Sequence, residues 1–469
     1  LRLLGDRGGE GLAPGIEALG KGGVLKGENA GGHEAGIGSA TDGHGGDRVA
    51  FRHLEDRVKR IDPGQCLCLD RHADHLFQVA TKGLGEDMSV QDWVYVVTAP
   101  TAANISPQEM YTVCLTGCLE LIHCGVTSLI DMNYMAQTFA HHDENIHALV
   151  DSGLRSIYTS IISDYGLQYG IPEYLMRPTD WFIDQYDQLI TKYPPTERLA
   201  VWMAVGAPWT VSGEGLDKSL AFSKRTGTPM VMHIGENWVD NHCSQDRFGM
   251  NSVPYLEKIG FLRPELLAIH CVTLDDEDIA LFVKNNVKVS YNPVSNMYLG
   301  NGIPPMMKMR DAGLRIGLGV DGAGSNNSQD MIETLKMAAL LQKGAAKDPS
   351  VINAQQVLDW ATLGGAQILG LEDQIGSLEV GKQADLFVIA PNSAKVVPIH
   401  DPVATLVYSC GQENVEMTIA NGVILMQDGV IQHLDEPEIL RQCQEMSLAL
   451  AERCGSDSKV KRSWKGNRA

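Results

Sequence analysis

Short runs of apolar residues recur through the middle of the chain, and most of them lack a strict alternation of apolar and polar positions. Such runs are typical of strands in a parallel sheet that is buried on both faces. Helix-like stretches separate them, such as 107–124, which has Pro107 at its start and Gly125 after its end. The predicted strands are 126–130, 155–159, 199–205, 229–232, 266–269, 287–290, 316–320 and the segment just before His75.

This alternation of eight strands with helices spans about 250 residues, which is a normal length for a barrel. The predicted fold class is therefore α/β, with a (β/α)₈ barrel of the TIM type. At 469 residues the chain is also long enough for a second, smaller domain. After the barrel, 384–390 and 415–420 have the composition of strands, and Asn421-Gly422 is a hairpin signal.

The first fifty residues differ in composition from the rest of the chain. They hold 16 of the 49 glycines, and 31–46 has almost no β-branched or aromatic side chains. Such a segment buries too little apolar area to offset the entropy lost on ordering, so it is poor strand material. At the other end, 436–452 is helix-like, and the polar, basic residues 456–469 are predicted to be disordered.

Composition narrows the class of protein. The formal net charge is −20, which argues against nucleic acid or an anionic membrane as a partner, because both attract basic surfaces. No stretch approaches about 20 uninterrupted apolar residues, and no secretion signal is evident, so a cytoplasmic enzyme acting on a small molecule is expected. The ten cysteines lack zinc-ribbon or redox spacing and are best explained as buried free thiols.

Four of the apolar runs end at a side chain of a type that binds metal ions, namely His75, His233, His270 and Asp321. A TIM barrel presents the ends of several strands to one pocket, so this layout predicts a mononuclear metal hydrolase site. A metal ion would also supply the charge that a buried Asp321 carboxylate needs. As alternatives, His233 and His270 could be core histidines, and Asp321 could cap the next helix.

Six short segments carry a more specific likeness, and they occur in one order between His75 and Gly429. With them the chain resembles the amidohydrolase superfamily, in the branch that holds S-adenosylhomocysteine and methylthioadenosine deaminases and s-triazine hydrolases. One such segment would be weak support, whereas six in order indicate membership. The segments are 120–131 (ELIHCGVTSLID), 233–236 (HIGE), 268–271 (AIHC), 292–296 (NPVSN), 319–322 (GVDG) and 375–385 (IGSLEVGKQAD).

This resemblance implies that His75, His233 and Asp321 bind the metal. Family members carry two histidines on the first strand, two residues apart, because alternate residues on a strand point the same way. Here Ala73 occupies the first of those positions, and the nearest histidine, His72, is three residues from His75. We expect a β-bulge to bring His72 inward as the fourth ligand, with Asp74 as the alternative.

The resemblance also implies that Glu236, His270 and Asp321 are catalytic. Asp321 would take a proton from water, Glu236 would exchange a proton with a ring nitrogen of the substrate, and His270 would steady the developing charge. One Zn²⁺ per chain, with Fe²⁺ as the alternative, would bind the hydroxide that acts as nucleophile. Glu236 and His270 would therefore contact the substrate as well.

Two further residues are candidates for substrate binding. Gln78 could hydrogen-bond a ring substituent, and Trp93 could stack on the heterocycle. Nucleoside deaminases of this branch carry a glutamate that binds the ribose hydroxyls, but the matching segment 100–104 (PTAAN) has no acid, which favours a smaller ring. His141 and His142 follow the strand end at 131–134 and are predicted to start a solvated helix, with substrate contact as the alternative.

The predicted function is hydrolytic deamination of an aminated N-heterocycle of the purine, pterin, pyrimidine or triazine type, with release of ammonia. One alternative is a chlorohydrolase or N-alkylaminohydrolase of the s-triazine type. Another is a degenerate barrel that binds a ligand without turnover, which the irregular first strand motivates. We also expect a homo-oligomer, a dimer or higher.

The resemblance implies a small β-sandwich domain built from the chain ends beside the barrel. The expected segments are 1–65 as an atypical part of the sandwich, 66–385 as the barrel, 386–435 as the second part of the sandwich, and 436–469 as a helical and disordered tail.

Overall fold

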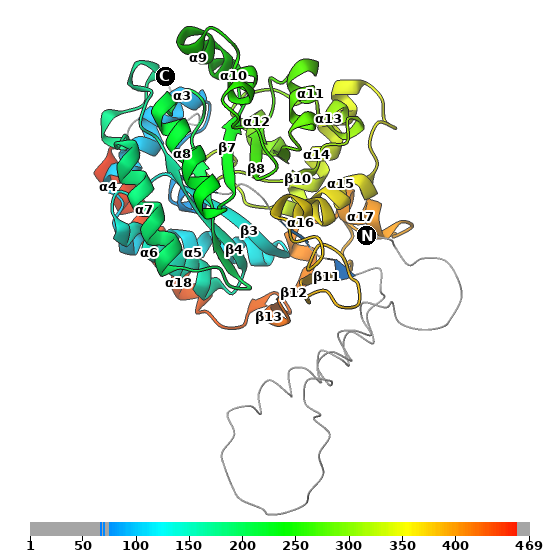
Figure 1. Ribbon diagram of the computed structural model, residues 1–469. Coiled ribbons are helices and arrows are strands. Elements are labelled where there is room, and N and C mark those ends of the chain that lie inside the picture. Colours follow the sequence, from blue (N-terminus) through cyan, green and yellow to red (C-terminus); the bar gives the residue numbers. More distant parts are fainter. Residues whose placement is uncertain (1–65, 68, 71–74, 457–469) are drawn as a thin grey trace, which may run out of the picture.

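The computed structural model describes residues 66–67, 69–70 and 75–456. Segments 1–65 and 457–469 and His72 lie outside the described residues, and so do the predictions made for them. The described chain contains two sheets, a large parallel one that is surrounded by helices and a small antiparallel one (Figure 1).

The large sheet forms the barrel. Its strands follow one another in chain order, all neighbouring pairs are parallel, and helices lie outside the curled sheet. This arrangement confirms the predicted α/β barrel, and each of the eight predicted strands is present. The strands are β2 (Leu69–Asp70), β3 (Val126–Asn133), β4 (Arg155–Ile162), β5 (Leu199–Val201), β6 (Met203–Val205), β7 (Met230–Ile234), β8 (Leu266–His270), β9 (Lys288–Tyr291) and β10 (Ile316–Leu318).

One predicted strand is divided in two. The run 199–205 forms β5 and β6, which both pair with β4, and Trp202 separates them. At the break, the hydroxyl of Tyr186 accepts the main-chain N–H groups of Ser160 and Ala204, each at 2.8 Å. The buried hydroxyl of Tyr186, from another element, thus pairs with backbone N–H groups that form no hydrogen bond within the sheet. The run 199–205 contains no turn residue that would have predicted this break.

Several helices of the barrel begin at a side-chain cap. The helix α5 (Pro107–His123) begins at Pro107, as its sequence predicts, and a capping box between Ser106 and Glu109 precedes it. The other helices of the barrel include α3 (Val90–Trp93), α4 (Ala99–Asn104), α6 (Phe139–Ser152), α7 (Thr179–Lys192), α8 (Gly213–Thr226), α9 (Trp238–Phe248), α10 (Ser252–Lys258), α11 (Asp276–Lys284), α12 (Pro293–Tyr298), α13 (Met306–Asp311), α14 (Met331–Ala346), α15 (Ala354–Ala361) and α16 (Leu363–Leu369).

The small sheet is antiparallel and has five strands. The predicted hairpin joins its longest strands, with Asn421 and Gly422 both at positive φ. A strand from the beginning of the described chain pairs with β11, so both sides of the barrel sequence contribute to this sheet. The strands are β1 (Cys66–Leu67), β11 (Leu386–Ile389), β12 (Val415–Ala420), β13 (Val423–Gln427) and β14 (Val430–Ile431).

Close packing joins the small sheet to the barrel. Gly125, which ends α5 at φ +78°, lies against the ring of Phe387 in β11, and a Cβ at Gly125 would come within 2.6 Å of that ring. Beside this contact, the buried Arg155 at the start of β4 pairs with the buried Asp385 just before β11. Figure 1 shows the small sheet at the end of the barrel that is opposite α9 and α10.

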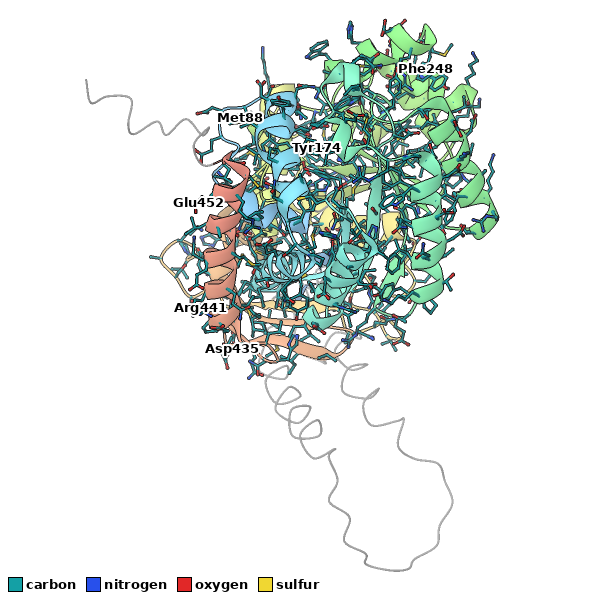
Figure 2. All side chains as sticks on the ribbon, turned by 90° about the vertical axis from the view of Figure 1, so that its left-hand side faces the viewer. Met88, Tyr174, Phe248, Asp435, Arg441 and Glu452 are labelled. Atoms are coloured by element: carbon teal, nitrogen blue, oxygen red, sulfur yellow. The ribbon has the colours of Figure 1, made fainter. Side chains whose placement is uncertain are left out.

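The last described helix, α18 (Glu436–Cys454), runs along the side of the barrel (Figure 2). It begins near the small sheet, and it packs against α5 and α4. The predicted helix at 436–452 is therefore confirmed. No helix among the described residues combines the length and apolar character needed to cross a membrane.

Candidate active site

The strand ends bring the predicted site residues to one pocket. His75, His233, Glu236, His270 and Asp321 all line it, although they come from segments as far apart in the sequence as 75 and 321. The pocket lies at the carboxyl ends of the parallel strands, which is the end of a TIM barrel where active sites form. The five side chains therefore share one space, as the apolar runs predicted.

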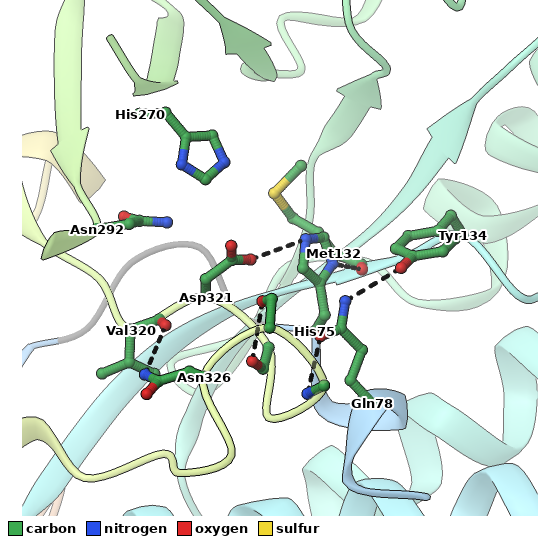
Figure 3. A network of polar contacts seen from close by, with 12 residues as sticks. His75, Gln78, Met132, Tyr134, His270, Asn292, Val320, Asp321 and Asn326 are labelled. Atoms are coloured by element: carbon green, nitrogen blue, oxygen red, sulfur yellow. Dashed lines mark hydrogen bonds and ion pairs between the residues drawn. The ribbon is translucent and has the colours of Figure 1, made fainter. Parts of the chain in front are cut away.

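His75 is held from behind by the next strand. Its Nδ1 lies 2.5 Å from the carbonyl oxygen of Met132 in β3, and the following amide, Leu76 N–H, donates to Asp131 at 3.1 Å. If Nδ1 donates to that carbonyl, Nε2 is the ring atom that faces the pocket. There Nε2 lies 3.2 Å from Oδ1 of Asp321, and the two side chains point at each other (Figure 3).

Asp321 follows β10 in a strained backbone conformation, at φ +67°. Burial alone would raise the pKa of its carboxyl, but the hydrogen bond with His75 and the nearby histidine rings hold that pKa well below its ordinary value. The next helix, α14, is capped by Asp330 instead. The alternative interpretation of Asp321 as a helix cap is thus wrong, and its carboxylate is kept ionised inside the pocket.

His233 and His270 face each other from neighbouring strands. Their ring centroids are 5.2 Å apart, and those of His75 and His233 are 5.6 Å apart in nearly parallel planes. Burial lowers the pKa of His233 well below its ordinary value, and the two neighbouring histidines add to this effect, so this imidazole is neutral. The pKa of His75 is raised instead, because Asp321 and the Met132 carbonyl outweigh the effect of burial.

Asn296, in α12, orients His270. Its Oδ1 lies 2.9 Å from Nδ1 of His270, whose Nε2 is buried and has no hydrogen-bond partner among the described residues. Like Asp321, His270 has a positive φ, +73°, which places its ring at the very end of β8. A buried ring nitrogen without a partner, aimed into a pocket, indicates a position where a ligand binds.

Glu236 lies two residues beyond β7, in the turn that leads to α9. Its Oε1 accepts a hydrogen bond from Asn301 at 3.1 Å and lies 4.0 Å from Nε2 of His270. Burial, which outweighs the attraction of His270, raises the pKa of Glu236 above its ordinary value. The site therefore combines a carboxyl that tends to keep its proton, Glu236, with one that tends to stay ionised, Asp321, and this contrast suits an acid and a base.

The two predicted substrate contacts, Gln78 and Trp93, also line the pocket. The polar ends of Gln78 are already engaged, since Nε2 donates to the Tyr134 hydroxyl and Oε1 accepts the Gly324 amide, both at 3.1 Å (Figure 3). Gln78 thus ties the loop after Asp321 to the end of β3. The indole N–H of Trp93 is buried and has no partner within the described structure.

The rest of the wall is largely apolar. Its single cation among the described residues is Arg177, which donates to the carbonyls of Tyr174 and Met176 and to Gln137. Glu236 and Asp321 are the lining carboxylates of the described chain. The apolar and aromatic lining includes Val90, Val94, Ile161, Ile171, Leu175, Trp181, Phe182, Ala207, Trp209 and Leu299.

The chemistry of these groups fits a divalent cation of the zinc type, which prefers imidazole nitrogen and carboxylate oxygen. Three features favour that class of ion: the lowered pKa of His233, the lowered pKa of Asp321 and the unpartnered Nε2 of His270. A histidine binds a metal ion only in its neutral form, so His75 would have to give up its proton. In the described residues, no group of three or more His, Cys, Asp or Glu side chains is arranged closely enough to hold a metal ion. His75 and Asp321 instead contact each other, and the expected fourth ligand, His72, is outside the described chain.

One prediction about neighbouring residues is wrong, and two residues beside the predicted ones were not predicted. His141 and His142 do not start a solvated helix, because both are buried in α6, and neither lines the pocket. Tyr134 and Asp240 belong to the site but were not predicted. Tyr134 was detectable as an aromatic residue directly after β3, whereas Asp240 resembles an ordinary acidic residue in the first turn of a helix.

Comparison with known proteins agrees with this geometry. Residues 72–425 match the amidohydrolase family. The 5′-deoxyadenosine deaminase of Methanobrevibacter smithii is 32% identical over 417 residues, which cover 89% of this chain and 91% of that protein. The 5-methylthioadenosine/S-adenosylhomocysteine deaminase of Syntrophobacter fumaroxidans is 31% identical over 398 residues, which cover 84% and 88% of the two chains.

Solved structures share the fold. An adenosine deaminase from Xanthomonas campestris with bound zinc superposes with a TM-score of 0.76 at 24% identity, covering 83% of this chain and 87% of that one. The atrazine chlorohydrolase of Arthrobacter aurescens, complexed with zinc, gives 0.76 at 22% identity, covering 81% and 88%. With most of its length matched and with relatives above 30% identity, the chain belongs to the amidohydrolase family.

Proposed function

We propose that this protein is a divalent-metal hydrolase that removes the exocyclic amine of an adenine-type nucleoside as ammonia. The observation that carries the proposal is the contrast between Glu236, whose pKa is raised by burial, and Asp321, whose pKa is lowered, across one pocket that also holds His75, His233 and His270. An acid and a base on opposite sides of one carbon are what exchange of an amine for water requires. The relatives that cover nearly the whole chain are deaminases of 5′-deoxyadenosine and of 5-methylthioadenosine/S-adenosylhomocysteine.

His75, His233 and Asp321 are the residues that would hold the metal, with His72 as the fourth candidate and zinc as the proposed ion. When bound, such an ion polarises a water molecule and lowers its pKa. The remaining chemistry falls to the side chains of the chain.

Proton transfer can be followed atom by atom. Asp321 takes one proton from the attacking water while Glu236 gives its proton to the ring nitrogen next to the amine-bearing carbon. The new C–O bond forms, and the proton on Asp321 passes to the amine, which leaves as ammonia. Glu236 recovers a proton from the new hydroxyl, so the product is the cyclic amide and both carboxyls return to their starting states.

The surrounding residues hold these groups in place. Asn301 fixes the Glu236 carboxyl, and Asn296 orients His270, whose Nε2 faces the position of the developing charge. His270 would thus stabilise that charge without moving. Side chains that are already oriented in this way lower the activation barrier, because they need to move little when the reaction takes place.

The pocket wall bears on the rest of the substrate. No residue of α4 lines the pocket, so the lack of an acid at 100–104 is no argument against a nucleoside. The lining carboxylates within the described chain are committed to proton transfer, and the wall next to them is mostly apolar. We therefore expect small, neutral 5′ substituents, as in 5′-deoxyadenosine and 5′-methylthioadenosine, to be preferred over the charged S-adenosylhomocysteine.

Ammonia release from a panel of compounds tests the proposal. The panel contains 5′-deoxyadenosine, 5′-methylthioadenosine, S-adenosylhomocysteine, adenine, a pterin and an amino-triazine, with chloride release from atrazine measured in parallel. We expect the two neutral 5′-deoxynucleosides to give the highest kcat/KM. Chloride release without ammonia from any adenine compound would favour the s-triazine alternative, and no turnover with loaded protein would favour a non-catalytic barrel.

A further inference from the structure

Asp240 is a second carboxyl directly beneath the turn that carries Glu236, and the mechanism above does not use it. It lies in the first turn of α9 and is completely buried. Its Oδ2 accepts the main-chain N–H of Glu236 at 3.2 Å, while Oδ1 has no hydrogen-bond partner in the described chain. A buried carboxyl group that forms no ion pair with a described residue is costly when ionised, which indicates that the group does something other than stabilise the fold.

Asp240 connects two functional parts of the pocket. Besides the Glu236 amide, the main-chain amide of Gly235 and the indole of Trp209 lie close enough to stabilise its charge. Trp209 lines the pocket wall, and Glu236 lies across from Asp321 in the same pocket. One side chain therefore touches both the turn of the proposed proton donor and an aromatic residue of the substrate wall.

The turn above Asp240 has little freedom. Gly235 has φ +62°, and a Cβ there would come within 2.5 Å of Leu274. Thr273 N–H donates to the Gly235 carbonyl at 2.9 Å, so the loop after β8 holds this turn from one side. Asp240 holds it from the other side through the Glu236 N–H, so the main chain of this turn is fixed on both sides.

We infer that Asp240 is a positioning residue that fixes Glu236 and Trp209 relative to each other and acts as a neutral acid while the enzyme turns over. The inference rests on the proposed role of Glu236. In the neutral form the carboxyl still accepts the Glu236 amide, and it adds no negative charge beside a group that must itself become negative when it releases its proton.

The charges around Asp240 support this state. Burial and the nearby Glu236 raise the pKa of Asp240 to about 8. The other titratable groups that face it are Cys243 on α9 and Cys271 after β8; burial raises the pKa of Cys243 to about 11 and that of Cys271 further. Asp240 is thus the group of this set that changes charge just above neutral pH, and that charge would make proton release from Glu236 less favourable.

The test compares Asp240→Asn with Asp240→Ala. Asparagine keeps an acceptor for the Glu236 amide and stays neutral at every pH, so we expect kcat to stay within about threefold of the wild type, whereas alanine should lower kcat by about tenfold or more. In the wild type kcat should fall above about pH 8, and Asp240→Asn should lose that decline. Asp246→Asn, an exposed position on the same helix, is the matched control and should change neither quantity.

A second readout needs no substrate. Ionisation of Asp240 beside the Trp209 indole should change tryptophan fluorescence between about pH 7 and 9 in the wild type, and both Asp240→Asn and Trp209→Phe should abolish that change. A fluorescence titration with no activity on any substrate would refute the proposed function and the catalytic part of this inference, and would leave only the titration of Asp240 beside Trp209. Equal loss of kcat in the asparagine and alanine variants with unaltered melting temperatures, or a titration that persists in Asp240→Asn, would overturn it.

Discussion

The two ends of the barrel each hold a buried aspartate, and these aspartates have different surroundings. Asp385, at the junction with the small sheet, accepts hydrogen bonds from the Arg155 guanidinium at 3.1 and 3.3 Å and from the Asn421 amide at 2.7 Å. Asp321, at the pocket end, has a positive φ and stands among three imidazoles. The junction carboxylate has a cation and a main-chain amide as partners, although Nε of Arg155 has none among the described residues. The pocket end combines backbone strain at Asp321 with a buried His270 Nε2 that has no partner in the described chain.

This difference indicates that the two ends serve separate purposes. Strained backbone and unpartnered polar atoms lower stability, and they persist where chemistry requires them. A buried ion pair at the junction, between Arg155 and Asp385, fixes the small sheet against the barrel. If this is correct, equivalent changes at the two ends will affect different properties.

The largest expected effect is on turnover. Asp321→Asn keeps the shape of the side chain but removes the carboxylate that takes the proton from water, so kcat should fall by about 10³-fold. The melting temperature should fall, because the lowered pKa of Asp321 means that its ionised form is stabilised in the folded chain by His75 and the neighbouring histidines. Ammonia release and thermal unfolding of one preparation check both statements, and a loss of less than about tenfold would end the assignment of Asp321 as the base.

The same substitution at the other end should act on stability. Asp385→Asn leaves the Arg155 guanidinium buried without its counter-charge, and the free energy of unfolding should fall by about 3–5 kcal/mol in urea titrations. kcat per folded molecule should be unchanged. The double variant Arg155→Met/Asp385→Leu, which removes both charges, should be less destabilised than the single one. Loss of kcat without loss of stability in Asp385→Asn would show that the two ends are not separable.

His142, a buried histidine in α6, allows the stability of the fold to be tested separately from the site through its pH dependence. Burial, followed by the charge of His141, lowers the pKa of His142 from 6.5 to about 4. The unfolded chain therefore binds this proton more readily, so stability is full above pH 6.5 and is lost as the pH falls toward 4. The difference amounts to about 3 kcal/mol.

The variant His142→Gln isolates this contribution. Its free energy of unfolding should fall less between pH 7 and 4.5 than that of the wild type, by up to about 3 kcal/mol. His147→Gln, an exposed histidine on the same helix, is the control and should behave as the wild type does. Identical pH dependence in the wild type and His142→Gln would show that this ring is not held neutral.

The smallest effect is expected at Gln78. Because both of its polar ends bind the protein, Gln78→Ala should loosen the loop after Asp321 and lower kcat by about tenfold, with little change in KM. An increase in KM at unchanged kcat would instead support the sequence-based prediction that Gln78 binds the substrate ring.

The sequence predicts the barrel and the meeting of distant residues for the same reason. Parallel strands share one direction, so side chains that follow β7, β8 and β10 must lie at the same end of the sheet. That argument brings His233, His270 and Asp321 together without coordinates, and the structure confirms the fold. Their roles as metal ligands and catalysts stay predictions.

Other features depend on contacts that spacing does not encode. The burial of His142 depends on Tyr158, whose hydroxyl lies 2.6 Å from its Nδ1. The position of Asp240 under Glu236 depends on how α9 leaves its turn, and the partners of Gln78 come from β3 and from the loop after β10. In each case the decisive contact is polar and depends on how two elements pack or turn, so no hydrophobic pattern indicates it.

The central claim is that histidines and an aspartate from separate strand ends hold one divalent ion that drives deamination. The most direct measurement is ammonia release from 5′-deoxyadenosine as zinc is added back to chelator-treated protein, with bound zinc counted per chain. Activity should rise in proportion to bound zinc and level off at about one ion per chain, and His233→Ala should neither bind the ion tightly nor gain activity. Full activity in protein that contains no metal, or tight binding of zinc by His233→Ala, would contradict the account.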